Sequence, residues 1–134
     1  MKECVFCRKD QLVTDIIFED ELVMAFMDME PINEGHLLLA HKEHYLDIDE
    51  MPDEILTHLM LISKKILIAL KDIYKPDGYS MMQNGGEFND VGYYHLHIFP
   101  RYRNDGFGWT YGDESKEVNS EIACKIRKKI SDFV

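Results

Sequence analysis

Two histidines, His95 and His97, stand one residue apart in the aromatic stretch GYYHLHIFPRY. Successive side chains of a β-strand point to opposite faces, so both imidazoles would share one face of a strand, about 6.6 Å apart. A single phosphate group can touch both rings. The pair suits nucleophilic attack on phosphorus assisted by charge stabilisation, or zinc binding, or packing and hydrogen bonding alone. By the same alternation Tyr93 and Phe99 lie on the histidine face, and the core face carries Tyr94, Leu96 and Ile98.

Cysteines are the second group with reactive side chains. Cys4 and Cys7 form a Cys-x-x-Cys pair, which in a reducing compartment indicates metal or redox chemistry. Cys124 falls in a predicted helix and is expected to be a packed small hydrophobe.

Composition limits the class of protein. The chain has 134 residues, 46% hydrophobic and 30% charged, as in soluble globular proteins. The net charge of −10 would repel bulk nucleic acid, although a local cluster of donors can still bind a small anion. No apolar run is long enough to span a membrane, and the start MKECVFCRKD has no signal core. We therefore expect a cytoplasmic protein without membrane contact.

The strands and helices that would position these residues are predicted from hydrophobic periodicity and from helix-breaking residues. Strands are predicted over 13–19, 22–27, 36–41, 79–84 and 92–100. A long helix is predicted from Pro52 to the breakers Pro76 and Gly78, and a second helix is marked by Val118 to Ile130. The order favours one α+β domain over residues 1–134, with an antiparallel sheet of about five strands.

A longer series of motifs is shared with a known family. The chain carries CVFC, FEDELVMAFMDMEPINEGHLLLAHKEH, QNGG, HLHIFPRY and DGFGW in this order. With this series of motifs the chain resembles the histidine-triad (HIT) family of nucleotide-binding hydrolases and transferases. The resemblance covers most of the chain and implies a HIT-like fold.

Roles for individual residues follow from this resemblance. It implies that His95 is the nucleophile that attacks the α-phosphorus and forms a nucleotidyl-histidine. His97 would bind phosphate oxygens, and His36 would line the site. Asp28 would accept hydrogen bonds from ribose hydroxyls, and Asn84, or Gln83 after a shift of one residue, would place an amide near the phosphate.

Simpler roles exist for three of these side chains. His36 can cap its strand, and Asp28 can be a turn residue near Pro31. Asn84 precedes two glycines and has the sequence of an ordinary turn.

The sequence departs from the family pattern at several positions. Tyr93 occupies the first place of the triad. Asp90 falls where many members present a hydroxyl, and a carboxylate there would repel phosphate, so Asn89 is the alternative donor. His41 replaces a proline.

A structural zinc is implied by some bacterial relatives. Its ligands would be Cys4, Cys7 and His44, while the fourth position is Tyr93, whose phenol is a poor ligand at neutral pH. Water, His41 or a carboxylate can complete the shell. The resemblance also implies that catalysis itself needs no metal.

The resemblance further implies a homodimer, paired through the long helix and an edge strand, and a purine nucleotide or nucleotide conjugate as substrate. Dinucleoside polyphosphates, phosphoramidates and adenylylated molecules remain open. One rival hypothesis is a nucleotide-binding protein with little turnover, because of Tyr93 and Asp90. Another is a zinc-binding regulatory module built on the cysteine pair. Trp109 and Phe107 would stack on a base or pack against a second subunit.

Overall fold

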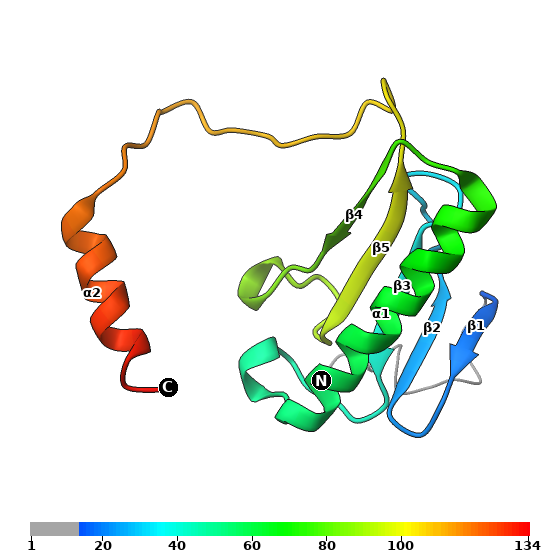
Figure 1. Cartoon of the computed structure of the whole chain (residues 1–134), viewed down its shortest axis with the longest axis horizontal. Helices are drawn as coiled ribbons and strands as arrows, with labels where there is room; N and C mark the ends of the chain where they lie inside the picture. The colour runs from blue at the N-terminus through cyan, green and yellow to red at the C-terminus, as the bar shows by residue number, and fades with distance from the viewer. Residues whose placement is uncertain (1–13) are drawn as a thin grey trace.

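The computed structural model describes residues 14–134 and contains one antiparallel sheet with a long helix packed on it (Figure 1). The strands are β1 (Ile16–Glu19), β2 (Val23–Met27), β3 (Leu37–His41), β4 (Gly78–Met82) and β5 (His95–Arg101). The α-helices are α1 (Asp53–Tyr74) and α2 (Ser120–Ile130), and two 3-10 turns cover Ile48–Glu50 and Gly86–Phe88. No helix of the described part is long and apolar enough to cross a membrane.

The sheet has the order β1-β2-β3-β5-β4, and every pairing is antiparallel. The predicted α+β class with five strands is therefore confirmed. Strand β5 lies between β3 and β4, so its side chains are held from both sides. In the register, Ala40 pairs with His95 and Leu38 with His97. This central position fixes the spacing of the two histidines better than an edge strand would.

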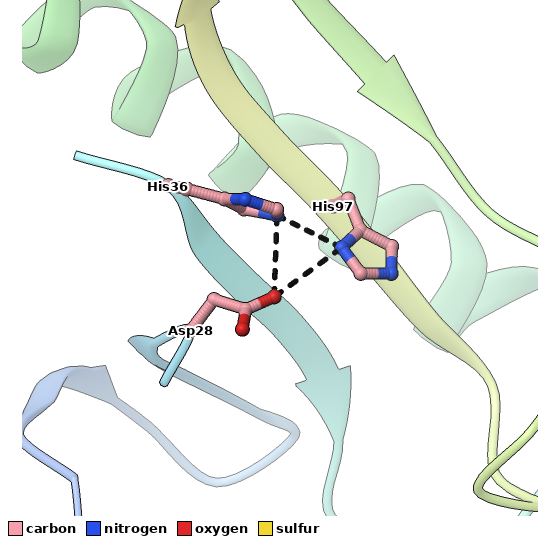
Figure 2. A group of neighbouring side chains, drawn as sticks. All are labelled: Asp28, His36 and His97. Carbon is pink, nitrogen blue, oxygen red and sulfur yellow. Dashed lines mark hydrogen bonds and ion pairs between the residues drawn. The ribbon is translucent and has the colours of Figure 1, made fainter. Parts of the chain in front are cut away.

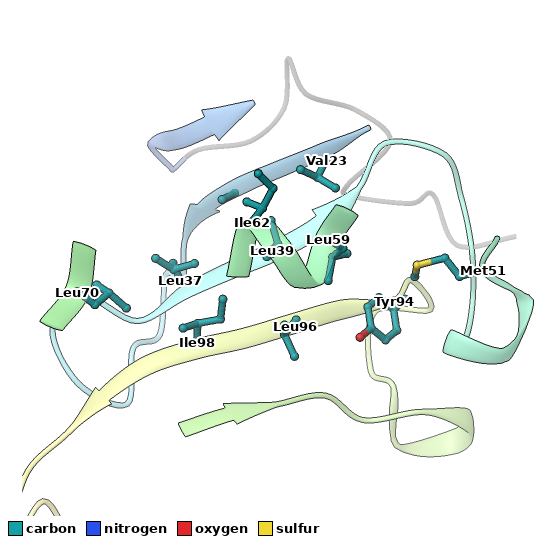
Figure 3. Packing of buried hydrophobic residues seen from close by; sticks show 11 residues of the cluster. Val23, Leu37, Leu39, Met51, Leu59, Ile62, Leu70, Tyr94, Leu96 and Ile98 are labelled. Atoms are coloured by element: carbon teal, nitrogen blue, oxygen red, sulfur yellow. The ribbon is translucent and has the colours of Figure 1, made fainter. Parts of the chain in front are cut away.

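The main core lies between the sheet and α1 (Figure 3). It includes the three β5 residues that alternation assigned to the core face, Tyr94, Leu96 and Ile98, all buried. They meet helix residues such as Leu59 and Ile62, which follow the predicted spacing of three to four. Packing α1 on this face leaves the opposite face of β5, with the histidines, for the site.

Helix α1 begins after Pro52, whose fixed φ suits a helix start, and ends where Lys75 adopts a left-handed conformation (φ 48°) before Pro76. This sharp end returns the chain directly into β4. The predicted end of the helix before Pro76 is confirmed, whereas Gly78 is already the first residue of β4.

The C-terminal helix lies apart from the body of its own chain (Figure 1). Its N-terminus is capped by the Asn119 side chain, which accepts from the backbone N–H groups of Glu121 and Ile122. All of its residues are exposed, including Cys124. The prediction that Cys124 is packed is therefore wrong for the single chain, because no residue among 14–134 covers this helix.

Candidate active site

Three elements bring the site residues together on the histidine face of the sheet. Strand β5 supplies His95 and His97, and Asp28 follows β2 directly. His36 precedes β3, and its carbonyl accepts a hydrogen bond from the Asp28 N–H (3.0 Å). The strand pairing thus joins positions that are far apart in the sequence.

Asp28, His36 and His97 form a compact group (Figure 2). Nε2 of His36 lies 2.9 Å from Nδ1 of His97 and 3.3 Å from Oδ2 of Asp28. Nδ1 of His97 lies 3.7 Å from the same carboxylate oxygen. The structure therefore brings together three of the residues that the sequence assigned to the site.

The backbone sets the proton positions in this group. The N–H of Ile32 donates to Nδ1 of His36 (3.0 Å), so a neutral His36 carries its hydrogen on Nε2. That hydrogen points to Nδ1 of His97, which accepts it. His97 then carries its own hydrogen on Nε2, ready to donate to an anion. His36 does more than cap its strand, because both of its ring nitrogens are engaged.

His95 is oriented by a different backbone group. Its Nδ1 donates to the carbonyl oxygen of Tyr93 (2.8 Å), which leaves the lone pair on Nε2. The rings of His95 and His97 meet edge to face with centroids 4.9 Å apart. One ring therefore offers a nucleophilic nitrogen next to a ring that offers an N–H.

Burial keeps His36 and His97 uncharged. It lowers the pKa of His97 to about 4, with further lowering by charge on His95 and His36 and opposition from Asp28 and Asp90. Burial also lowers the pKa of His36, against the raising effect of the Asp28 charge. At neutral pH both rings are neutral, as the hydrogen-bond chain requires.

The ligand atoms of Asp28, His36 and His97 lie within 4.8 Å of one another, a grouping that can hold a metal ion. The N–H of Ile32 occupies the lone pair on Nδ1 of His36, so the hydrogen of the neutral ring lies on Nε2. A metal ion at Nε2 would need a lone pair on that atom instead. The donor set fits a hydrogen-bonded network better than a metal centre.

The amide side chains proposed from the sequence to lie near the phosphate do not share one environment. Met82 pairs with His97 in the register, so continued alternation puts Asn84, which is exposed, on the histidine face and Gln83 on the other. Asn89 is buried, and its Nδ2 donates to the carbonyl of Leu46 (3.2 Å). Asn89 therefore anchors its own loop, and the phosphate-binding roles of Asn84 and Asn89 remain predictions.

Tyr93 is fully buried, and its hydroxyl donates to the carbonyls of Glu43 (2.7 Å) and His41. The ring stacks on His41 and meets His44 edge to face at 4.8 Å between centroids. With its hydroxyl committed to two carbonyls, Tyr93 is unsuited to ligate zinc. The predicted ligands Cys4 and Cys7 lie outside the described residues.

His41 has the features of a metal ligand. It is 1% exposed, and its Nδ1–H donates to the carbonyl of Glu43. Burial lowers its pKa to about 4, so it is neutral at pH 7. Within the described residues its Nε2 has no hydrogen-bond partner. Ligating histidines commonly donate their second nitrogen to a carbonyl in this way.

An ion-pair network that the sequence analysis missed closes the end of β5. Arg101 binds Asp105 through Nε (2.6 Å) and a second nitrogen (3.0 Å), and donates to the Phe107 carbonyl (2.6 Å). Asn33 also donates to Asp105 (3.0 Å). In the sequence, the Pro-Arg pair of HLHIFPRY and the aspartate four residues after the arginine could have indicated this network.

This network borders a cavity of about 290 Å³ next to the site. It is lined by Ser80, Met81, Met82, Arg101, Phe107, Gly108 and Trp109. Its wall includes Met82, the cross-strand partner of His97. A group attached to a phosphate at His97 therefore has an adjoining, mostly apolar space.

Known proteins share both sequence and fold with this chain. Residues 9–104 match the HIT domain family. An uncharacterized HIT-like protein of Methanocaldococcus jannaschii is 38% identical over 92% of this chain and 98% of its own length. Adenosine 5'-monophosphoramidase HNT1 of Saccharomyces cerevisiae is 30% identical over 95% of this chain and 80% of its own length.

Solved structures of HIT family proteins are also similar to this chain in fold. A HIT family protein from Bacillus anthracis superposes with a TM-score of 0.86 at 34% identity, covering 99% of this chain and 98% of the other. A zinc-bound histidine triad family protein from Mycobacterium smegmatis has a TM-score of 0.72 at 28% identity, covering 83% and 84%. The chain belongs to the HIT family.

Proposed function

We propose that this protein hydrolyses nucleotide conjugates at the α-phosphorus through a nucleotidyl-histidine on His95, as a single domain of residues 1–134. The main support is the hydrogen bond from Nδ1 of His95 to the Tyr93 carbonyl, which presents Nε2 as the nucleophile beside His97. The relative named as an adenosine 5'-monophosphoramidase supports an adenosine phosphoramidate as the first substrate to test.

In the first step Nε2 of His95 forms a bond to phosphorus, and the bond from phosphorus to the leaving group breaks. A leaving nitrogen departs as ammonia or an amine after taking one proton from solvent. The imidazole gains positive charge, which the Tyr93 carbonyl at Nδ1 stabilises. The Nε2–H of His97 would donate to a phosphoryl oxygen as charge develops there.

In the second step water attacks the same phosphorus and the bond to Nε2 breaks. The water loses a proton to solvent, and the products are a nucleoside monophosphate and neutral His95. Two easier displacements thereby replace one difficult step. His36 would hold His97 in the tautomer that keeps its N–H towards phosphate.

Nucleotide binding would use the residues around the histidines. We assign the ribose hydroxyls to Asp28, next to His36 and His97, and phosphate contacts to Asn84 and Asn89. Asn89 has a second amide hydrogen besides the one donated to Leu46. A purine base is the expected substrate feature.

The experiment compares the parent with His95→Asn on adenosine phosphoramidate and on a dinucleoside polyphosphate. Release of AMP is followed by chromatography, and AMP affinity by calorimetry. We expect AMP from the parent only, with a loss of at least about a thousandfold in the variant, since removing the nucleophile removes the covalent route. Equal turnover by both proteins would refute the assignment of His95.

A binding protein with little turnover is the second candidate, and Asp90 is the observation that favours it. Its charge acts on His97, close to where a phosphate would lie. This candidate predicts AMP binding to the parent without product. The variant Asp90→Ser would then restore turnover, whereas the hydrolase proposal expects turnover in the parent already.

We also propose a structural zinc bound by Cys4, Cys7, His44 and His41, with His41 in place of the first triad residue. The support is the buried Nε2 of His41 and the commitment of the Tyr93 hydroxyl to backbone carbonyls. Zinc would join the N-terminal segment to the end of β3, and no catalytic step would use it.

Metal content by mass spectrometry and the visible spectrum of the cobalt form test this ligand set. We expect one zinc per chain, and in His41→Ala a metal affinity lowered more than about tenfold, since losing a ligand costs more than losing an outer partner. Tyr93→Phe should bind normally. Unchanged binding by His41→Ala would remove His41 from the set. If removal of the metal by a chelator unfolds the protein and His95→Asn behaves like the parent, these results would support the hypothesis of a zinc-binding regulatory module.

A further inference from the structure

Asn33 lies in the loop of residues 28–36, which joins β2 to β3 and ends at His36. Its backbone carbonyl accepts a hydrogen bond from the N–H of His36 (3.1 Å). Its side chain leaves the loop, and Nδ2 donates to the carbonyl of Pro100 (2.9 Å) and to Oδ2 of Asp105 (3.0 Å). Both amide hydrogens are thereby used, and the loop is tied to the end of β5.

Asp105 is a firmly held partner for this side chain. Its carboxylate is 6% exposed and also accepts from Arg101, through Nε (2.6 Å) and a second nitrogen (3.0 Å), and from the N–H of Phe107 (3.2 Å). Hydrogen bonds to a charged acceptor are about twice as strong as neutral ones. Arg101 and Phe107 also line the cavity beside the site, so Asn33 fastens the loop to the wall of that cavity.

The N–H of Ile32, the residue before Asn33, decides which nitrogen of His36 carries the hydrogen. It donates to Nδ1 of His36 (3.0 Å), so the hydrogen lies on Nε2 and points to Nδ1 of His97 (2.9 Å). The side chain of Ile32 is 38% exposed, whereas that of Asn33 makes two directed bonds to another element. Asn33 therefore does most to fix the direction of this N–H.

Two neutral rings can share their two hydrogens in two consistent ways. With the hydrogen of His36 on Nε2, His97 accepts at Nδ1 and carries its own hydrogen on Nε2, towards a phosphate. With the hydrogen of His36 on Nδ1, the bond between the rings reverses, and Nε2 of His97 offers a lone pair that repels a phosphoryl oxygen. Only the first arrangement gives the charge stabilisation that hydrolysis needs.

Asp28 does not choose between the two arrangements. Its Oδ2 lies 3.3 Å from Nε2 of His36 and 3.7 Å from Nδ1 of His97, the two nitrogens that share the hydrogen (Figure 2). The carboxylate faces an N–H in either case, so its charge favours both arrangements. The N–H of Ile32 favours the first arrangement alone, because it needs a lone pair on Nδ1 of His36.

We propose that Asn33 is a positioning residue for the hydrolysis of nucleotide conjugates. By tying the loop to β5, it keeps the N–H of Ile32 on Nδ1 of His36. Through His36 it keeps the N–H of His97 towards the phosphate. Its effect on the rate rests on the proposed function, whereas the tautomer of His97 can be measured in the free protein.

Nitrogen-15 NMR of the imidazoles in Asn33→Ala is the first test. The variant removes both amide donors and keeps the backbone carbonyl of residue 33. We expect the His97 ring to change from Nε2–H in the parent to a mixture of tautomers. Asn33→Asp, which keeps the shape of the side chain and loses the donors, should show the same change. The matched control is Glu34→Gln, at an exposed position of the same loop, which should keep the parent spectrum.

Kinetics with adenosine phosphoramidate give the second readout, and urea unfolding checks that each variant is folded. For Asn33→Ala we expect kcat to fall by about tenfold, the lower end of the range for loss of an outer partner. KM should change little, because the N–H of His97 acts as charge develops in the transition state. Asn33→Gln keeps the amide on a longer side chain and should recover part of the loss. A purely structural role would lower stability without moving the His97 signals.

Failure of this role can be told apart from failure of the proposed function. If the parent releases no AMP, the proposed function fails, and the spectra still decide whether Asn33 sets the tautomer. If the parent is active and Asn33→Ala keeps the His97 spectrum of the parent, the positioning role is overturned. It is also overturned if Glu34→Gln changes that spectrum as much as Asn33→Ala does, or if kcat falls while the spectrum stays the same.

Discussion

Nδ1 of His95 lies 2.8 Å from the backbone carbonyl oxygen of Tyr93, so the residue in the first triad position orients its neighbour through its main chain. The side chain of Tyr93 points elsewhere and donates to the carbonyls of Glu43 and His41. Any residue at position 93 supplies the same carbonyl. Replacement of the first histidine is therefore compatible with an intact nucleophile.

Tyr93→Phe should reduce stability more than activity. The variant keeps the carbonyl at residue 93 but removes a buried donor, which costs about 1–3 kcal/mol when acceptors stay buried. Urea unfolding measures the first effect, and AMP release from adenosine phosphoramidate measures the second, expected to stay within about threefold. Loss of turnover in a folded variant would show that the hydroxyl itself serves the site.

His36→Phe should disturb the tautomer of His97. Without the Nε2–H of His36, nothing at that position donates to Nδ1 of His97, and the proton on His97 is no longer confined to Nε2. Nitrogen-15 NMR of the imidazole should show Nε2–H in the parent and a mixture in the variant. We expect kcat/KM to fall by about 10- to 100-fold, the range seen when the hydrogen-bond partner that orients a functional histidine is lost. An unchanged His97 spectrum would exclude this positioning role.

Alternation and helical periodicity predicted much of the fold. Tyr94, Leu96 and Ile98 lie in the core and His97 on the other face, because β5 is central and obeys the period of two. Asp28 and His36 were placed near His97 only through the family resemblance. Their proximity depends on the pairing of β2, β3 and β5, which no local pattern determines.

Partners of individual polar groups could not be predicted. The amide of Asn89 reaches Leu46, and Nδ1 of His36 accepts from Ile32, both through loop backbones. Periodicity likewise predicted α2 but not that Cys124 would be exposed, because an apolar stripe indicates a helix and does not show which element, if any, packs against it.

Arg101→Lys should loosen the turn that follows β5. Arg101 makes two parallel bonds to Asp105 and a third to the Phe107 carbonyl, a fork that a single ammonium cannot reproduce. Asp105 is held ionised, with a lowered pKa caused first by Arg101. We expect Arg101→Lys to unfold at a lower urea concentration than the parent, because the variant loses a bidentate, charge-assisted pair of hydrogen bonds. Lys125→Arg, a conservative change at an exposed position, is the control and should change nothing.

Stability should decrease as the pH drops from 6.5 to about 4, because of His36 and His97. Burial lowers the folded-state pKa of His97 to about 4, and that of His36 is lowered too, whereas an unfolded histidine titrates near 6.5. In this window the unfolded chain binds more protons than the folded one, so acid favours unfolding. The stability is full above pH 6.5 and is lost as the pH falls towards 4.

Urea unfolding at several pH values between 7.5 and 4.5 measures this slope, and His97→Asn supplies the comparison. The shift of His97 corresponds to a loss of up to about 3 kcal/mol across the window, at about 1.4 kcal/mol per pKa unit. The groups that face His97, namely His95, His36, Asp28 and Asp90, remain in the variant. A shallower slope in His97→Asn is therefore assigned to His97 itself. Equal slopes in the two proteins would mean that His97 titrates normally and that its ring is not held neutral by burial.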